Sequence, residues 1–437
     1  MVTIAENLTL LKSTKAGIKA AIEAKGVSNV GDKFSDYPAK IASIPTGGST
    51  SGVSQWTGTV DRAGLTELGW STTDIDNLQA NVRWYDWQDP DYTVVDADKS
   101  ITDISQYRNN KDVRYAKMLD TSQVTNMVNK FSGCSNLTSI PTLDTSQVTG
   151  MSGMFQDCIS LTTIPALNTS QVTSMGAMFG GCTSLASIPT LDTSQVTGMN
   201  DMFSTCTSLT SIPALDTSKV TNMNYMFNGC SSLTTIPALN TSQVTSMTNM
   251  FYGCTNLTSI PALDTSKVTN TVYMFYGCTN LTSIPALDTS KVTNMNYMFQ
   301  GCSRLISIPA LDTSKVTDMN QMFYDCTSLT TIESIDFSSC TNTGYMFPSW
   351  TNYSKLTSIH VTGSISFSWT SDGFSSIPNL DFNSIKSILE AMNRCTNPET
   401  AKTMSFNSTM TDQDSQLTNL VSECNGKGWT ITGLTIN

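Results

Sequence analysis

The sequence predicts a solenoid, a rod of short coils stacked along one axis, with small α/β regions at its two ends. Two observations lead to this fold class. Nine cysteines from Cys134 to Cys326 lie 24 residues apart, and one pattern of apolar and polar residues recurs with them. A unit of 24 residues is too short to bury its own apolar side chains, so neighbouring units must stack and share a core.

Residues 1–46 are predicted to be a helical attachment or oligomerisation segment, followed by a Gly/Ser-rich linker at residues 47–52. Residues 4–25 have the apolar spacing of an amphipathic helix, and Gly26 is placed to end it. We find neither the basic-then-apolar pattern of an export signal nor an apolar run long enough to enter a membrane. The side chains expected to make the attachment are Leu8, Leu11, Ile18 and Ile22.

Residues 53–118 are predicted to form a small Trp-rich domain or an N-terminal cap, because four of the seven tryptophans lie there. Five aspartates in this region could suggest a calcium site. The D-x-D-x-D-G spacing of a calcium loop is absent, so a solvated loop is the better interpretation and no metal is expected. The aspartates are Asp86, Asp89, Asp91, Asp96 and Asp98.

Residues 119–350 contain nine regular units and a degenerate tenth, which predicts nine to ten coils. The consensus is L-D-T-S-x-V-T-x-M-x-x-M-F-x-G-C-x-x-L-T-x-I-P-A, numbered here from position 1 at the leucine. Its apolar positions should point inward, while Asp, Thr and Ser should bond the turn backbone and the equivalent side chains of neighbouring coils. L-T-x-I-P has the pattern of a short strand ended by proline. V-T-x-M-x-x-M-F fits either a strand or a helical turn.

Residues 351–437 are predicted to be an α+β cap or tip. Some such cover is expected because the last coil of a solenoid would otherwise expose an edge that aggregates. Gly426 is placed to end the second helix. The predicted elements are strands at 356–361, 404–407 and 429–434 and helices at 382–394 and 412–424.

The motif M-F-x-G-C-x-x-L-T-x-I-P, as in residues 226–237, resembles leucine-rich repeats of the BspA type. It is also similar to the related repeat of unknown function in mycoplasma lipoproteins and gut-bacterial surface proteins. The resemblance covers the repeats and implies a leucine-rich-repeat β-solenoid. It further implies a surface for binding or adhesion.

The leader carries a second pattern, N-L-x-L-L-x-x-T-K-x-x-I-K-x-A-I-x-x-K-G at residues 7–26. This pattern resembles the N-terminal segment of bacteriophage appendage proteins. The resemblance implies a protein made in the bacterial cytoplasm and attached to a virion through its N-terminus.

The composition excludes several kinds of chemistry. The net charge is −11 and no basic run occurs, which argues against nucleic acid as a partner. A Ser-His or Cys-His catalytic pair would depend on His360, the single histidine. The cysteine and methionine columns could bind soft metals, but core packing is the better interpretation. We therefore expect no enzyme, no cofactor and no metal site.

The outward positions that vary between units are the better candidates for function. Positions 11 and 14 hold tyrosines in the C-terminal half of the repeats. Stacked tyrosines offer amphipathic area suited to sugars or to another protein. Alternatively, they cover neighbouring apolar surface. The candidate residues are Tyr225, Tyr273 and Tyr297 at position 11 and Tyr252, Tyr276 and Tyr324 at position 14.

These observations lead to one hypothesis and one alternative. The first is a non-enzymatic virion structural protein, a tail or head fibre, that binds a host-cell glycan or protein or decorates the particle. It would be a homo-oligomer, with a trimer as the expected state, and would bind other virion proteins through its N-terminus. The alternative is a BspA-like adhesin on the bacterial cell surface.

Overall fold

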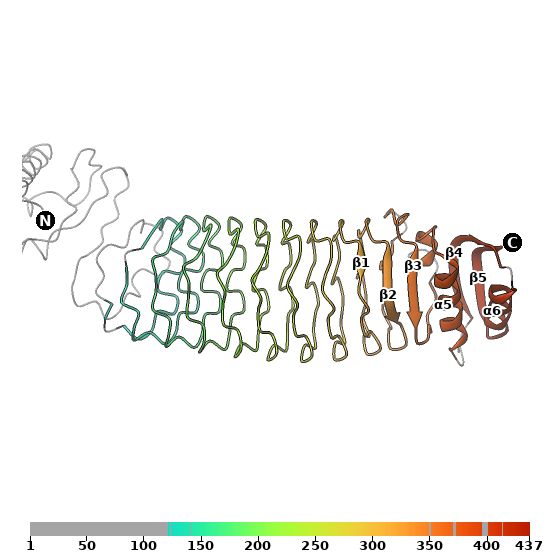
Figure 1. The fold of residues 1–437 in the computed structure, drawn as a ribbon, viewed down its shortest axis with the longest axis horizontal. Helices are drawn as coiled ribbons and strands as arrows, with labels where there is room; N and C mark the ends of the chain where they lie inside the picture. Colours follow the sequence, from blue (N-terminus) through green and yellow to red (C-terminus); the bar gives the residue numbers. More distant parts are fainter. Residues whose placement is uncertain are drawn as a thin grey trace, which may run out of the picture.

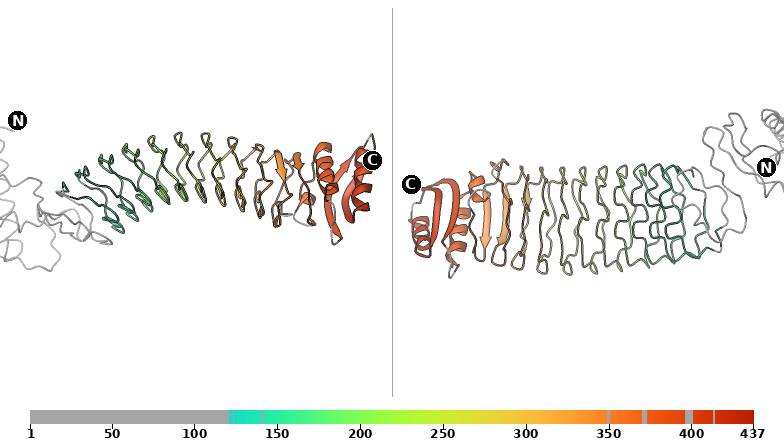
Figure 2. Two further views of the ribbon diagram at one scale, coloured as in Figure 1. Left: turned by 90° about the horizontal axis from the view of Figure 1, so that it is seen from below. Right: turned by 180° about the vertical axis from the view of Figure 1, so that it is seen from behind.

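The computed structural model describes residues 121–437 except 123, 141, 349–350, 370–372, 396–400 and 413. These residues form one elongated, gently curved rod of stacked coils (Figures 1 and 2). The predicted leader, linker and Trp-rich region lie outside the described residues, and with them the attachment residues Leu8, Leu11, Ile18 and Ile22.

The coils stack in parallel at a fixed interval. An isolated parallel bridge joins position 8 of each coil to position 8 of the next, from Asn126 to Asn342 in steps of 24 residues. On the same side of the coil, the backbone N–H of Thr221 donates to the carbonyl of Thr197 in the preceding coil, at 3.1 Å. Equivalent residues of successive coils therefore come to lie over one another.

The M-x-x-M-F segment is neither a strand nor a helical turn of the usual kind. In one coil, the N–H groups of Tyr225, Phe227 and Gly229 donate to the next coil at 2.6–3.0 Å. The residues between them donate within the coil, as Met226 does to Met223 at 3.2 Å. Alternate amides therefore point along the rod and around the turn, so the backbone is satisfied without a regular element.

This alternation depends on two left-handed residues in each coil, at positions 11 and 15. Position 15 is usually glycine, as in Gly229 with φ 69°, but Thr205 occupies it with φ 58°. Glycine adopts this region without steric cost, whereas a β-branched residue does not. The consensus glycine is therefore explained by the left-handed backbone conformation that position 15 requires.

The predicted L-T-x-I-P strand is regular only near the C-terminal end. There, β1 (Ser307–Ile308), β2 (Thr331–Asp336) and β3 (Ser358–Thr362) form a parallel sheet in the order β1-β2-β3. Glu333 replaces the proline of the consensus inside β2. Proline cannot donate to a ladder, which explains why earlier coils have single hydrogen bonds here, such as Thr258 N–H to Thr234 at 3.3 Å.

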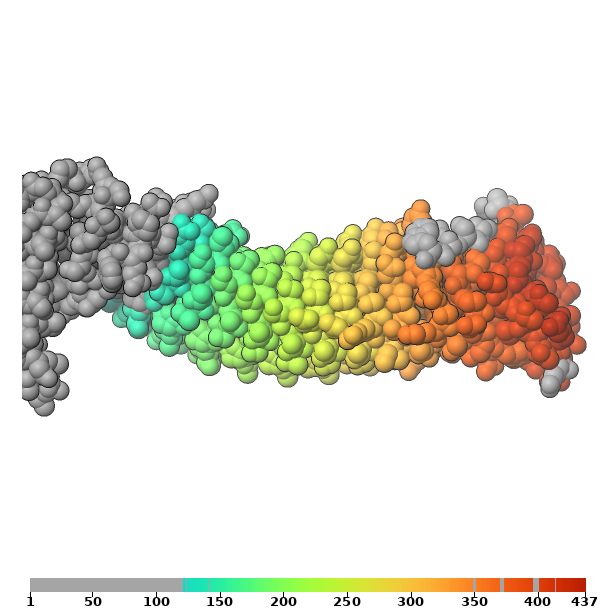
Figure 3. Space-filling model, turned by 90° about the horizontal axis from the view of Figure 1, so that it is seen from above, coloured from blue at the N-terminus to red at the C-terminus, as the bar shows by residue number. Residues whose placement is uncertain are grey.

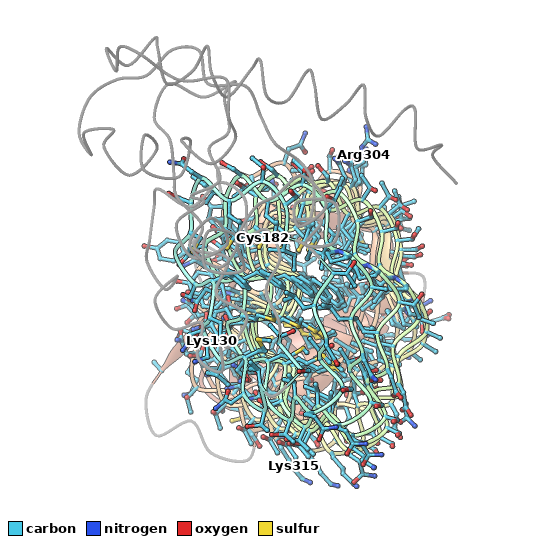
Figure 4. All side chains as sticks on the ribbon, turned by 90° about the vertical axis from the view of Figure 1, so that its left-hand side faces the viewer. Lys130, Cys182, Arg304 and Lys315 are labelled. Carbon is cyan, nitrogen blue, oxygen red and sulfur yellow. The ribbon has the colours of Figure 1, made fainter. Side chains whose placement is uncertain are left out.

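The core consists of columns of identical side chains, as the repeat predicts. Phenylalanine rings from Phe131 to Phe347 stack in one column with centroids 5.6–5.9 Å apart. The valine, methionine, cysteine and leucine columns beside it are also buried. Figure 4 shows the sulfur of Cys182 inside the rod, while the charged ends of Arg304 and Lys315 lie at its rim.

The polar positions bond mainly to backbone. The carboxylate of Asp216 accepts from the N–H of Ser218 at 2.9 Å, as expected for an Asx turn. The buried hydroxyl of Thr217 donates to the carbonyl of Asn240 in the next coil at 2.8 Å. The sequence analysis expected such a side chain to bond its equivalent in the next coil. At this threonine it bonds the backbone of the next coil instead.

The C-terminal region continues the stack with coils that contain helices (Figure 1). It comprises η3 (Phe374–Ser376), α5 (Phe382–Asn393), β4 (Lys402–Met410), α6 (Gln416–Gly426) and β5 (Trp429–Ile436), with β4 and β5 paired in parallel. Asp381 caps α5 by accepting from the N–H of Ser384 at 2.7 Å. The strands and helices predicted here are confirmed, except that α6 begins four residues later than predicted. Gly426 is the last residue of α6, and Gly428 after it takes the left-handed conformation with φ 87°.

An aromatic group lies between the last repeats and this C-terminal region. The ring of Trp369 contacts Phe337, Phe347 and Phe374 at centroid distances of 4.7–6.0 Å. The hydroxyl of Tyr353 donates to the carbonyl of Phe323 at 3.0 Å. These contacts bury the end of the phenylalanine column.

Exchanging the residues at position 15 tests the conformational argument. We expect Thr205→Gly to raise the free energy of unfolding by about 1 kcal/mol, because it removes a left-handed β-branched residue. Gly253→Thr should lower it by about 1–2 kcal/mol, although the nearest atom to an added Cβ is 3.8 Å away. Urea unfolding followed by circular dichroism measures both. Changes of the same sign would contradict the argument.

Candidate functional site

Positions 11 and 14 lie on the turn that flanks the buried Met-Phe pair of each coil. Position 14 closes this turn, because its N–H donates to the carbonyl of position 11, as Tyr276 does to Tyr273 at 3.2 Å. Met274 and Phe275, between these two tyrosines, are fully buried. The core therefore anchors the turn, and successive turns place their outward side chains in two parallel columns.

Four of the six predicted tyrosines form one cluster, defined here as Tyr252, Tyr273, Tyr276 and Tyr297. Tyr252 stacks on Tyr276 with centroids 4.5 Å apart, and Tyr273 stacks on Tyr297 at 4.6 Å. The two stacks meet where Tyr273 and Tyr276 tilt against each other at 5.6 Å. The tyrosine cluster spans three consecutive coils.

The other two predicted tyrosines lie beyond the ends of the cluster. Tyr324 shares the position-14 column with Tyr276, but Gln300 separates them in register. Tyr225 lies at position 11, two coils before Tyr273, and is 39% exposed. Within the described part of the chain, its ring and hydroxyl make no aromatic contact or hydrogen bond. The structure therefore stacks four of the six predicted tyrosines in one cluster and places the other two in the same columns beyond it.

Polar neighbours that the sequence analysis missed complete the surface. The amide of Gln321 donates to the hydroxyl of Tyr297 at 2.8 Å. The side-chain oxygens of Asn296 and Gln300 are buried and accept no hydrogen bond from the described residues. Tyr345, which is 45% exposed, occupies position 11 of the degenerate unit. Aligning that unit at position 11 would have identified it.

Burial and neighbouring hydroxyl groups favour the neutral form of two tyrosines in the cluster. Partial burial is the main cause that raises the pKa of Tyr273, followed by the neighbouring tyrosine hydroxyls. The same causes raise the pKa of Tyr276. The cluster therefore offers aromatic edges, hydroxyl groups and amides, a set suited to recognition through hydrogen bonds and apolar contact.

The tyrosines at position 11 have a backbone conformation that disfavours them. Tyr225, Tyr273 and Tyr297 have φ of 57–59°, in the left-handed region. This region costs an L-residue about 1–2 kcal/mol, with glycine and asparagine the usual exceptions. Asn129 and Asn249 occupy the same position elsewhere in the array with φ of 56–57°. A tyrosine at position 11 is therefore less favourable to folding stability than a glycine or an asparagine.

The other candidate residues lie apart from this surface. Each repeat cysteine is buried, and from Cys158 onward the thiol donates to a phenylalanine carbonyl of the preceding coil, as Cys230 does to Phe203 at 3.0 Å. In the described ranges, no group of His, Cys, Asp or Glu side chains could hold a metal ion. His360 is exposed on β3. No described helix is long and apolar enough to cross a membrane.

Comparison with known proteins extends the description of the repeats. A family model described as "Mycoplasma protein of unknown function, DUF285" matches residues 99–211, 186–280 and 256–360. None of the curated proteins matches the chain.

Several solved structures are similar to the chain at low identity. One is a leucine-rich repeat protein from Eubacterium ventriosum, at 16% identity over 67% of this chain and 93% of its own, with TM-score 0.32. A second is the plant peptide hormone receptor RGFR1 in complex with RGF2, at 14% identity over 72% and 52%, with TM-score 0.28. A third is the Drosophila Toll–Spatzle complex, at 11% identity over 66% and 48%, with TM-score 0.25. The chain spans about half the length of these two receptor chains.

The thiol column predicts a loss of stability at alkaline pH. Burial raises the pKa of Cys206, Cys254 and Cys302 from 9.0 to about 12. Unfolded thiols ionise near pH 9 while folded ones stay protonated, so the stability they contribute is present below pH 9 and lost toward pH 12. Replacing all three by serine should make the decline between these values shallower by up to about 4 kcal/mol per pH unit.

Urea unfolding at pH 8, 9, 10 and 11 measures this slope. The serine variant will also be less stable at pH 8, so the slope and not the absolute value decides the test. An unchanged slope would mean that the thiols ionise equally in the folded and unfolded chain.

Proposed function

Because the chain belongs to the DUF285 family of Mycoplasma proteins of unknown function, and its repeat motif resembles leucine-rich repeats, we propose that it acts as a non-enzymatic, adhesin-like binding protein. An array of nine to ten 24-residue coils would form its rigid body. The outward columns at positions 11 and 14 would form its binding face, at the surface of a bacterial cell.

The single observation that carries this proposal is the tyrosine cluster. The inward positions are nearly invariant and already filled by the core, so they cannot provide specificity. Positions 11 and 14 do vary, and in three adjacent coils they place four aromatic rings together on the outside. Tyrosine contributes large contact area at low entropic cost, which makes it frequent in binding surfaces.

The shape of the repeats also suits recognition of an extended ligand. The array has a continuous elongated surface from the first described coils to the C-terminal region (Figure 3). In solenoid proteins, such surfaces commonly serve as binding faces because each coil adds one row of side chains. A ligand lying along the rod would meet the tyrosine columns coil after coil.

A binding panel tests the proposal. The full-length protein is applied to immobilised neutral polysaccharides, acidic polysaccharides and purified cell-surface proteins. We expect at least one to bind, and the variant Y252S/Y273N/Y276S/Y297N to bind it at least about tenfold more weakly, which corresponds to about 1.4 kcal/mol. The control variant changes exposed threonines of position 20 to serine, at Thr210, Thr234, Thr258 and Thr282. Equal binding by wild type and the tyrosine variant would contradict the assignment of the face.

A bacteriophage virion appendage is the second candidate. Its support is the leader pattern at residues 7–26, which lies outside the described residues. In this case the leader would attach to other virion proteins, and the array would bind a host-cell glycan or protein or decorate the particle. The protein would be a homo-oligomer, with a trimer as the conventional state of a fibre.

Light scattering separates the two candidates. For an adhesin that binds through its array, we expect the monomer mass for the full-length protein and for the variant L8D/L11D. A trimer or other closed oligomer that dissociates in L8D/L11D would favour the appendage, because charged side chains in the predicted apolar stripe would break its association. An oligomer that persists in this variant would exclude these leader residues as its cause.

A further inference from the structure

Tyr225 has a strained left-handed backbone, and its side chain makes no hydrogen bond or aromatic contact with the described residues that would offset the cost in stability. Its φ is 58° and its side chain is 39% exposed. Tyr273 and Tyr297 share this conformation but gain a ring stack at 4.6 Å, whereas Tyr225 has no such partner among the described residues. Asparagine, which occupies the same position at Asn249, would satisfy the backbone at lower cost. Because every coil needs a left-handed residue at this position, the feature that calls for a functional explanation is the choice of an exposed tyrosine over asparagine.

The groups around Tyr225 indicate the chemistry of a ligand. Asp201 occupies position 11 of the preceding coil, and its N–H donates to the carbonyl of Asn224 at 2.9 Å, so the two residues lie one coil apart in register. Asn228 closes the same turn as Tyr225. An aromatic ring beside a carboxylate and an amide can stack on the apolar face of a sugar and bond its hydroxyl groups. The carboxylate and the net charge of −11 both disfavour an anionic ligand.

The backbone of this turn also argues against a peptide added as a strand. Such a peptide needs free N–H and C=O groups along an edge. Here the N–H groups of Tyr225, Phe227 and Gly229 already donate to the next coil. Recognition on this face must therefore use side chains.

We infer that Tyr225, with Asp201 and Asn228, forms a binding site for a neutral polysaccharide that extends along the rod toward the tyrosine cluster. This inference rests on the proposed binding function and names the ligand class. Beyond Tyr225, the tyrosine cluster supplies aromatic rings and hydroxyl groups. Because the coils repeat along the rod, a polymer would reach more of these groups than a single sugar.

Affinity gel electrophoresis of the full-length protein tests this inference. The probes are soluble neutral polysaccharides, namely a β-1,3-glucan, a galactomannan, a xyloglucan and dextran, with alginate as an anionic comparison. We expect at least one neutral polysaccharide to retard the wild-type protein and alginate to have no effect. Tyr225→Asn should weaken the retardation at least about tenfold, and Asp201→Asn about threefold, which is the scale of one lost stacking or hydrogen-bonding contact.

Two further variants distinguish binding from folding. Ala177→Asn places asparagine at position 11 two coils before Tyr225, so it should leave binding unchanged. Tyr225→Asn and Ala177→Asn should each raise the melting temperature by about 2 °C, because each relieves left-handed strain. Tyr225→Phe retains the ring and should bind within about threefold of wild type, since a single neutral hydrogen bond contributes little net affinity. A lower melting temperature for Tyr225→Asn would show that the ring supports the fold and would overturn the argument from strain.

The remaining outcomes separate the inference from the function on which it rests. Full retardation of Tyr225→Asn, or retardation of the wild type by alginate alone, would overturn the inference. A wild-type protein that binds only a cell-surface protein in the panel above would also overturn it, while the proposed function would stand. A protein that binds no member of either panel would contradict both.

Discussion

The hydrogen bonds between successive coils are the constraint on which the rest of the structure depends. They join residues at a fixed interval of 24 along the sequence, from the bridge at Asn126 to that at Asn342. Once this register is set, every side chain lies over its counterpart in the neighbouring coil. The phenylalanine column, the thiol column and the tyrosine stacks all follow from it. An insertion of one residue in a coil would displace each of these columns at once.

The same constraint accounts for the unusual surface of the protein. Only 14% of residues are charged, because much of the polar surface is held by local bonds instead. Thr217 bonds the next coil and Asp216 bonds its own turn, so the repeated polar residues stabilise the stack. The hydrogen bonds of Ser218 lower the pKa of Asp216, which keeps the carboxylate ionised. Specificity is left to the few outward positions that the stack does not use.

Regular secondary structure appears where the repeat pattern ends. β2 continues past the point at which a proline stops the equivalent segment in earlier coils, because Glu333 stands there instead. Helices α5 and α6 then accompany the strands of the last coils, and Trp369 closes the aromatic column. The C-terminal region therefore covers the last side chains of the apolar columns.

The sequence alone determined the features that depend on local pattern. The cysteine period fixes the coil length, the inward columns follow from the consensus, and the C-terminal helices and strands were predicted close to where the structure has them. The sequence also identified the tyrosines of positions 11 and 14, although not which four of them stack together.

The tertiary structure decided what depends on the neighbouring coil. In the M-x-x-M-F segment, backbone hydrogen bonds alternate between the segment's own turn and the next coil. A local sequence pattern cannot show this alternation, so the sequence was compatible with both a strand and a helical turn. The left-handed conformation of Tyr225 cannot be predicted from the sequence either, since position 11 varies among glycine, asparagine, aspartate, alanine, glutamine and tyrosine. Only the stacked coils place Asp201 one coil from Tyr225 and leave that ring without an aromatic partner among the described residues, because distances across 24 residues are set by register and not by sequence proximity.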